Sequence, residues 1–207
     1  MNGAVGGNGA VGGQGAVGGQ GTDSPLLAVI DMQEFFAAGS PWEVPGFEDL
    51  IAPIGSLAGA YGPRTVFTRF VIPEVPQGSW VGYYQAWPQV LAPEAAHLAD
   101  LAQPWASQGL DTLDKTTFSK WGPELESMLG PGRDLTVCGV STDCCVIATV
   151  LDAVDGGAQV RVIADACAGI TPEAHEAALN LMGGFAPQVT FGSVEEELSR
   201  LAGAERA

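Results

Sequence analysis

Two adjacent cysteines occupy a position suited to a nucleophile. Residues 134–150 read DLTVCGVSTDCCVIATV, in which a short apolar run precedes a glycine and then valines at helical spacing. This pattern predicts a buried strand, a sharp turn and a helix capped by Thr142 or Asp143. Cys144 and Cys145 then lie at a helix N-terminus, where the dipole and free N–H groups favour a thiolate. The alternative is that both are packing residues, as buried cysteines often are.

Two charged residues end other predicted strands. Asp31 follows the apolar run at 26–30, and Lys115 ends a strand at 111–115. In a doubly wound sheet whose first and fourth strands are neighbours, Asp31 and Cys145 face each other across one crevice. Lys115 then stabilises the thiolate, while Asp31 takes the thiol proton and returns it to a leaving amine. Taken alone, Asp31 is better explained as a loop or helix cap.

The elements that hold these residues alternate between strands and helices. This alternation predicts an α/β fold in three layers, with helices on both faces of a doubly wound, six-stranded parallel sheet. The expected strands are 26–30, 64–70, 111–115, 135–140, 159–164 and 188–191, and the expected helices are 48–61, 93–101, 123–129, 142–154, 172–182 and 195–201. The segment 71–92, rich in proline, glycine and aromatic residues, is predicted to be irregular and to form a pocket wall.

The N-terminal residues have a different character. Residues 2–19 are three near-copies of a six-residue unit, NGAVGG, NGAVGG and QGAVGG. So much glycine cannot bury enough surface to offset its ordering entropy. We therefore expect residues 1–21 to form a flexible tail without a function, and residues 22–207 to form one domain.

Composition limits the partners. The formal net charge of −16, from 24 acidic and 8 basic residues, argues against nucleic acid and against an anionic membrane surface. The four cysteines lack the CxxC spacing of zinc or redox sites, so we expect reduced thiols in the cytoplasm. The sequence shows neither an apolar run of the ~20 residues that span a bilayer nor the pattern of a signal peptide.

Three motifs together resemble a known family. VIDMQEFF, DKTTFSKW and GVSTDCCVIATVLDA followed by VIADACAG are similar, in order and spacing, to the isochorismatase-like cysteine hydrolases over residues 26–198. Their amidohydrolase branch includes N-carbamoylsarcosine amidase, ureidoacrylate amidohydrolase, streptothricin hydrolase and nicotinamidase. The resemblance implies a homodimer or homotetramer and the triad Asp31, Lys115 and Cys145. It also implies a cis peptide at Val140–Ser141 that turns the N–H groups of Ser141 and Cys145 toward an oxyanion.

The resemblance leads to a particular activity. Nicotinamidases bind a metal through an aspartate and histidines after the second strand, where TRFVIPEVPQ has no histidine, and the chain holds only His97 and His175. We therefore expect no metal and no cofactor. A retained Cys145 favours hydrolysis of an amide or N-carbamoyl C–N bond of a small molecule through a thioester. The alternatives are an isochorismatase-type ether hydrolase, which does not depend on a thiol, and a non-catalytic oligomeric relative of the same fold.

The residues expected to bind the substrate are chosen by their position near the predicted crevice. They are Gln33, Phe36, Arg69, Trp80, Tyr84 and Trp121. For Arg69 and Trp121, an ion pair at the surface or structural packing is an equally good interpretation.

Overall fold

The computed structural model describes residues 24–204, so the predicted N-terminal tail lies outside the described residues. The predicted parallel sheet is confirmed: six strands pair in the order β3-β2-β1-β4-β5-β6, every pair parallel. The strands are β1 (Leu26–Ile30), β2 (Thr65–Phe70), β3 (Thr112–Lys115), β4 (Asp134–Val140), β5 (Gln159–Ala168) and β6 (Val189–Gly192).

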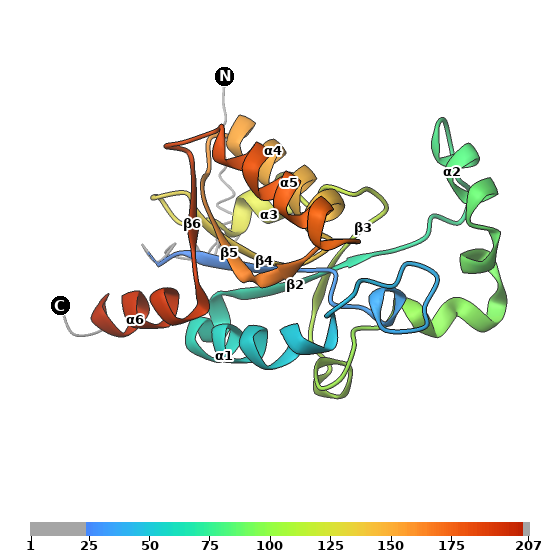
Figure 1. Cartoon of the computed structure of the whole chain (residues 1–207), viewed down its shortest axis with the longest axis horizontal. Coiled ribbons are helices and arrows are strands. Elements are labelled where there is room, and N and C mark those ends of the chain that lie inside the picture. Colours follow the sequence, from blue (N-terminus) through green and yellow to red (C-terminus); the bar gives the residue numbers. More distant parts are fainter. Residues whose placement is uncertain (1–23, 205–207) are drawn as a thin grey trace, which may run out of the picture.

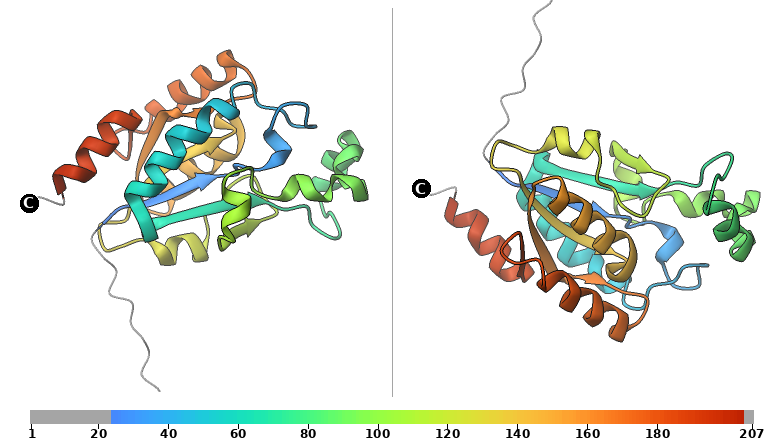
Figure 2. Two further views of the ribbon diagram at one scale, coloured as in Figure 1. Left: turned by 90° about the horizontal axis from the view of Figure 1, so that it is seen from below. Right: turned by 90° about the horizontal axis from the view of Figure 1, so that it is seen from above.

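Helices cover both faces of the sheet (Figure 1). Helices α1 and α6 lie on one face and α3, α4 and α5 on the other, whereas α2 lies beyond the carboxyl edge, as Figure 1 and the opposite views in Figure 2 show. The helices are α1 (Ile51–Tyr61), α2 (Trp80–Ala86), α3 (Pro123–Met128), α4 (Ile147–Asp155), α5 (Pro172–Gly183) and α6 (Val194–Ala204). The predicted helix 48–61 begins with a 3-10 turn, Glu48–Leu50, before α1. The predicted helix 93–101 is a 3-10 helix, Pro93–Ala99.

The two central strands, β1 and β4, approach closely at Gly139. All five residues of β1 are buried, and Ile30 pairs with Gly139 of β4. A Cβ added to Gly139 would lie 2.2 Å from the carbonyl oxygen of Ile30, and its φ of 111° suits glycine. A glycine at this point therefore lets the carboxyl ends of β1 and β4 lie side by side, which sets the spacing of the residues that follow them.

Two local predictions are wrong. Thr142 and Asp143 do not cap the helix after β4; residues Thr142–Val146 form a π-helical turn that leads into α4, and Ser141 at its start makes no side-chain cap. The segment 71–92, predicted to be irregular, contains α2. In α2 the aromatic residues at positions 80, 83 and 84 follow helical spacing and pack against one another.

Between Ser24 and Ala204, no helix combines the length and the apolar character needed to cross a membrane.

Candidate active site

A buried ion pair marks the carboxyl edge of the sheet. Asp31 directly follows β1, and its Oδ2 lies 2.9 Å from Nζ of Lys120, with both side chains completely buried. Thr68 of β2 donates its hydroxyl to Oδ1 of Asp31 at 2.7 Å and accepts the Asp31 N–H. No hydrogen bond of good geometry reaches Oδ2 from the described residues. One carboxylate oxygen is thus fixed, while the other keeps capacity to accept a proton.

Lys120, and not Lys115, occupies the position predicted for the triad lysine. Lys115 is the last residue of β3, and its ammonium pairs with the exposed Glu124 at 2.6 Å. The chain continues for five residues and then brings Lys120 back to the sheet. There its Nζ donates to the Thr117 carbonyl at 2.9 Å and lies 5.1 Å from the centre of the Phe70 ring. The sequence motif DKTTFSKW contains both lysines, and the structure places the second of them, not the predicted Lys115, beside Asp31.

Cys145 lies in the turn after β4, and its side chain is 3 % exposed. Thr149 connects it to the lysine: the Lys120 N–H donates to Oγ1 of Thr149, which donates to the Cys145 carbonyl at 2.7 Å. A hydrogen bond with Cys144, burial and the charge of Asp31 raise the pKa of the Cys145 thiol, and Lys120 opposes them. From the sequence, we expect the helix N-terminus to favour the thiolate, whereas burial and the neighbouring groups in the structure act in the opposite direction.

The turn carrying Cys145 also presents backbone N–H groups. The peptide Val140–Ser141 is cis, as the family resemblance implies. The Ser141 carbonyl accepts hydrogen bonds from the N–H groups of Cys144 and Val146 at 3.0 and 3.1 Å. It accepts none from the N–H of Cys145, which lies between them in sequence. This bonding pattern follows from the π-helical turn. It agrees with the prediction that the N–H groups of Ser141 and Cys145 form the oxyanion hole, which remains a prediction.

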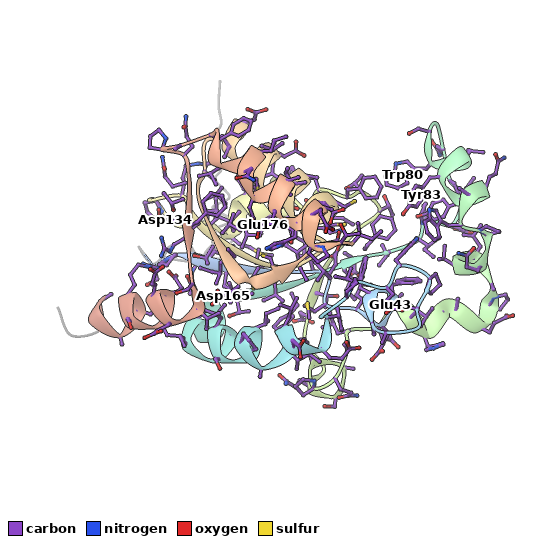
Figure 3. All side chains as sticks on the ribbon, in the orientation of Figure 1. Glu43, Trp80, Tyr83, Asp134, Asp165 and Glu176 are labelled. Carbon is purple, nitrogen blue, oxygen red and sulfur yellow. The ribbon has the colours of Figure 1, made fainter. Side chains whose placement is uncertain are left out.

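Beside these groups lies a cavity of about 460 Å³ that is mostly apolar and aromatic. Its walls come from the loop after β1, from α2, from the loop after β3 and from the turn after β4. Figure 3 shows Glu43 and Tyr83 on two of these walls, beyond the carboxyl edge of the sheet. The lining residues are Phe36, Ser40, Pro41, Trp42, Glu43, Val44, Phe70, Tyr83, Trp87, Phe118, Ser141, Asp143, Cys144, Cys145 and Ile170.

Of the six residues predicted to bind substrate, Phe36 lines this cavity. Gln33 is fully buried and has a structural role. Its amide donates to the carbonyls of Phe70 and Ala99 and accepts the Phe70 N–H, so it connects the end of β2 to the loop at residue 99. Both amide N–H groups and the carbonyl oxygen of Gln33 thus bond to the backbone, and Gln33 does not line the cavity.

The other four predicted residues do not line the cavity. Arg69 forms ion pairs with Asp114 at 2.6 Å and Asp100 at 3.8 Å. Trp80 packs on Phe118, with ring centres 4.8 Å apart, behind the cavity surface. Tyr84 is buried among the aromatic residues of α2. Trp121 lies against Gly156 after α4, where a Cβ would come within 2.5 Å of its ring.

Sequence reasoning missed most of the cavity wall. Trp42 and Glu43 lie in a loop rich in glycine and proline after β1, which carries no periodic pattern. Tyr83 is adjacent to the predicted Tyr84, but only its helix position decides which of the two faces the cavity. Burial and the charges of Cys144 and Cys145 raise the pKa of the Tyr83 phenol, in keeping with a place close to the two sulfurs. The signal that was available is the density of aromatic residues.

Among residues 24–204, no group of three or more histidine, cysteine or acidic side chains is placed to hold a metal ion.

These features define a three-layer α/β protein with a cysteine, a carboxylate and a lysine at the switch point of its sheet. The model of the isochorismatase domain matches residues 25–192. The chain therefore belongs to the isochorismatase family.

Curated relatives match shorter stretches. Isochorismatase domain-containing protein 2 of Xenopus laevis is 45% identical over 56 residues, which is 26% of this chain and 27% of that protein. The protein of the same name from Rattus norvegicus is 35% identical over 83 residues, 39% of this chain and 36% of its own. A secreted isochorismatase effector of Phytophthora sojae is 33% identical over 93 residues, 43% of each chain. The matches span less than half the length of each of these relatives.

Solved structures share the fold along most of the chain. A cysteine hydrolase from Pseudomonas syringae superposes with a TM-score of 0.73 at 22% identity, covering 87% of this chain and 93% of its own. Nicotinamidase from Bacillus subtilis gives 0.65 at 20% identity, covering 82% and 99%. Pyrazinamidase of Pyrococcus horikoshii, solved with zinc, gives 0.61 at 24% identity, covering 82% and 98%. At these identities the likeness describes the fold.

Proposed function

We propose that this protein is a metal-independent hydrolase that cleaves an amide or N-carbamoyl C–N bond of a small molecule through a thioester on Cys145. The observation that carries the proposal is the fully buried pair of Asp31 and Lys120, 2.9 Å apart, whose charges both act on a cysteine that lines the cavity. Burying two charges costs free energy, so such a pair next to a nucleophile is better explained by chemistry than by stability.

The first half of the reaction forms the acyl-enzyme. The Asp31 carboxylate takes the proton of the Cys145 thiol as sulfur attacks the substrate carbonyl carbon. A raised pKa disfavours the free thiolate, so the proposed step uses Asp31 as a base, and Lys120 offsets the negative charge that develops on sulfur. The oxyanion of the tetrahedral intermediate binds the N–H groups of Ser141 and Cys145. The protonated Asp31 then gives its proton to nitrogen, the C–N bond breaks and an amine leaves.

The second half frees the cysteine. A water molecule enters the place left by the amine, and Asp31 accepts one of its protons as the oxygen attacks the thioester carbonyl. The C–S bond breaks, sulfur regains a proton from Asp31, and a carboxylic acid leaves. From an N-carbamoyl substrate the acid is a carbamic acid, which loses carbon dioxide. Asp31 thus acts as base and acid in both halves, and Lys120 takes the role that the sequence assigns to Lys115.

Mass spectrometry of the intact protein tests this proposal. After brief incubation with a panel of small amides and N-carbamoyl amines, wild type should gain the mass of one acyl group, and peptide mapping should place it on Cys145. Cys145→Ala should show neither adduct nor turnover, whereas Cys144→Ala, the matched control one residue away, should keep both. Turnover should persist after chelation of divalent metals.

Two results would contradict the proposal. Full activity in Cys145→Ala would exclude a thioester and favour the ether hydrolase. A folded protein that neither hydrolyses nor is acylated by any member of the panel would favour the non-catalytic relative.

A further inference from the structure

The cavity beside Cys145 has an unusual charge balance. Its charged lining residues are Glu43 and Asp143, and the lining includes no lysine, arginine or histidine. A substrate bearing a carboxylate or phosphate would meet no cation on this wall, and its own charge would be repelled. The cavity therefore selects against anionic substrates and leaves neutral and cationic ones.

The two carboxylates differ in what they already bind. Oδ1 of Asp143 accepts the Ser141 hydroxyl at 2.8 Å and the Ile170 N–H at 2.9 Å, so this residue holds the turn of the cysteines. Glu43 accepts the Gly39 N–H through Oε2 at 2.8 Å, and none of the described residues bonds its Oε1. Glu43 has no cationic partner among residues 24–204. It is the carboxylate with capacity for a ligand.

Aromatic rings line the cavity together with Glu43. Trp42 precedes it in the chain, and its ring centre lies 6.1 Å from that of Tyr83 and 6.3 Å from that of Trp87. All three rings line the cavity, and the Trp87 ring stands at 74° to that of Trp42. Figure 3 shows Glu43 on the loop after β1 and Tyr83 on α2, on facing segments of the chain. Rings in such a wall attract a cation through their faces.

We infer that the substrate is a cationic amide: its ammonium group, primary or alkylated, binds between Glu43 and the rings of Trp42 and Trp87 while its carbonyl carbon meets Cys145. This inference rests on the proposed function for the bond that is cleaved. It adds the substrate class and makes Glu43 a specificity-determining residue. The volume of about 460 Å³ suits a small molecule whose two ends reach the two groups.

Three matched amides test the inference. They share one acyl chain and differ in its end group, which is trimethylammonium, the uncharged tert-butyl isostere or a carboxylate. For wild type, kcat/KM should fall in that order, with the cationic amide favoured about ten-fold over the isostere. Glu43→Gln should lower this ratio several-fold, because only the aromatic rings then favour the cation. The ratio cancels any general damage to catalysis. Glu74→Gln, which removes the same charge from an exposed loop, should keep the wild-type ratio.

Binding gives an independent readout when turnover is slow. Titration calorimetry with the three amides and Cys145→Ala should show the same order of affinity, and the double variant with Glu43→Gln should lose most of the preference for the cationic amide. Equal binding of the cationic amide and its isostere, or tighter binding of the carboxylate, would overturn the inference while leaving the thioester proposal intact. Preferential binding without any acylation of wild type would support the cation site and contradict the proposed hydrolysis.

Discussion

Two buried carboxylates on opposite edges of the sheet show how similar charge clusters can serve different ends. At the carboxyl edge, Asp31 pairs with Lys120, and Oδ2 accepts no well-aligned hydrogen bond from the described residues. Near the amino ends of β4 and β5, Glu197 of α6 accepts hydrogen bonds from Arg161, Arg200 and the Tyr61 hydroxyl. Both carboxylates are completely buried, but Asp31 keeps one oxygen, Oδ2, without a well-aligned hydrogen bond from the described residues, whereas both oxygens of Glu197 accept hydrogen bonds.

The difference extends to their surroundings. Glu197 lies among side chains that fasten α6 to the sheet and to α1, and its network includes Thr136 of β4 through Tyr61. Asp31 lies beside Cys145, which opens onto an aromatic cavity. A fully bonded cluster stabilises one arrangement of helices. A carboxylate with one oxygen free of a well-aligned hydrogen bond, as in Asp31, is better suited to accept and return a proton. Removing the charge of each carboxylate in turn tests this comparison.

The largest effect should come from Asp31→Asn. The amide keeps the shape and the hydrogen bond to Thr68 but cannot accept the thiol proton, so kcat/KM should fall at least ~10³-fold. Glu197→Gln, its counterpart at the other edge, should keep kcat/KM within about two-fold of wild type, because Glu197 touches neither Cys145 nor the cavity. Steady-state kinetics on the best amide of the panel measures both. Comparable losses in the two variants would mean that the two clusters are not functionally distinct.

A second effect should separate the two lysines. Lys120→Met removes the ammonium that offsets charge on sulfur, so kcat/KM should fall by about 10²-fold. Lys115→Met loses an exposed ion pair with Glu124, and such pairs contribute at most ~1 kcal/mol, so activity should barely change. Circular dichroism should confirm that each variant is folded. If Lys115→Met were the inactive variant, the assignment of Lys120 would be wrong.

The fold was predictable because strands and helices alternate along the sequence and most strands are short apolar runs. The burial of all five residues in β1 is the direct consequence of LLAVI lying at the centre of a covered sheet. The order of the central strands followed from the switch-point rule, which also placed Asp31 and Cys145 on one edge. These features depend on local pattern and on general topology, both of which are present in the sequence.

The lysine was not predictable in the same way. Lys115 ends a strand, so local pattern favours it, whereas Lys120 reaches Asp31 only because the loop after β3 folds back. The hydrogen bond from the Lys120 N–H to Thr149, 29 residues further along, helps to fix that return. A loop held by contacts distant in sequence has no periodic signature. The same reason explains why Glu43 was missed and Gln33 was misassigned.

The smallest effect concerns the stability of the Glu197 cluster and its dependence on pH. Burial alone would raise the pKa of Glu197, but the hydrogen bonds from Arg200, Tyr61 and Arg161 outweigh it and leave the pKa below its ordinary value of 4.5. A carboxyl whose pKa is lowered by folding stabilises the fold above its unfolded pKa, and this contribution is lost as pH falls through the folded pKa. Glu197→Gln should therefore lower the free energy of unfolding by about 2 kcal/mol at pH 7.

Urea unfolding of wild type and Glu197→Gln at pH 7 and at pH 3 measures this contribution. The difference between the two proteins should be smaller at pH 3, because pH 3 lies below the ordinary pKa of the carboxyl and part of the stabilisation from the lowered pKa is then lost. Glu195→Gln, an exposed position on the same helix, should change the free energy of unfolding by less than ~0.5 kcal/mol at either pH. An equal difference at both pH values would show that the cluster acts through shape and hydrogen bonding alone. In that case charge would matter only at the Asp31 edge of the sheet.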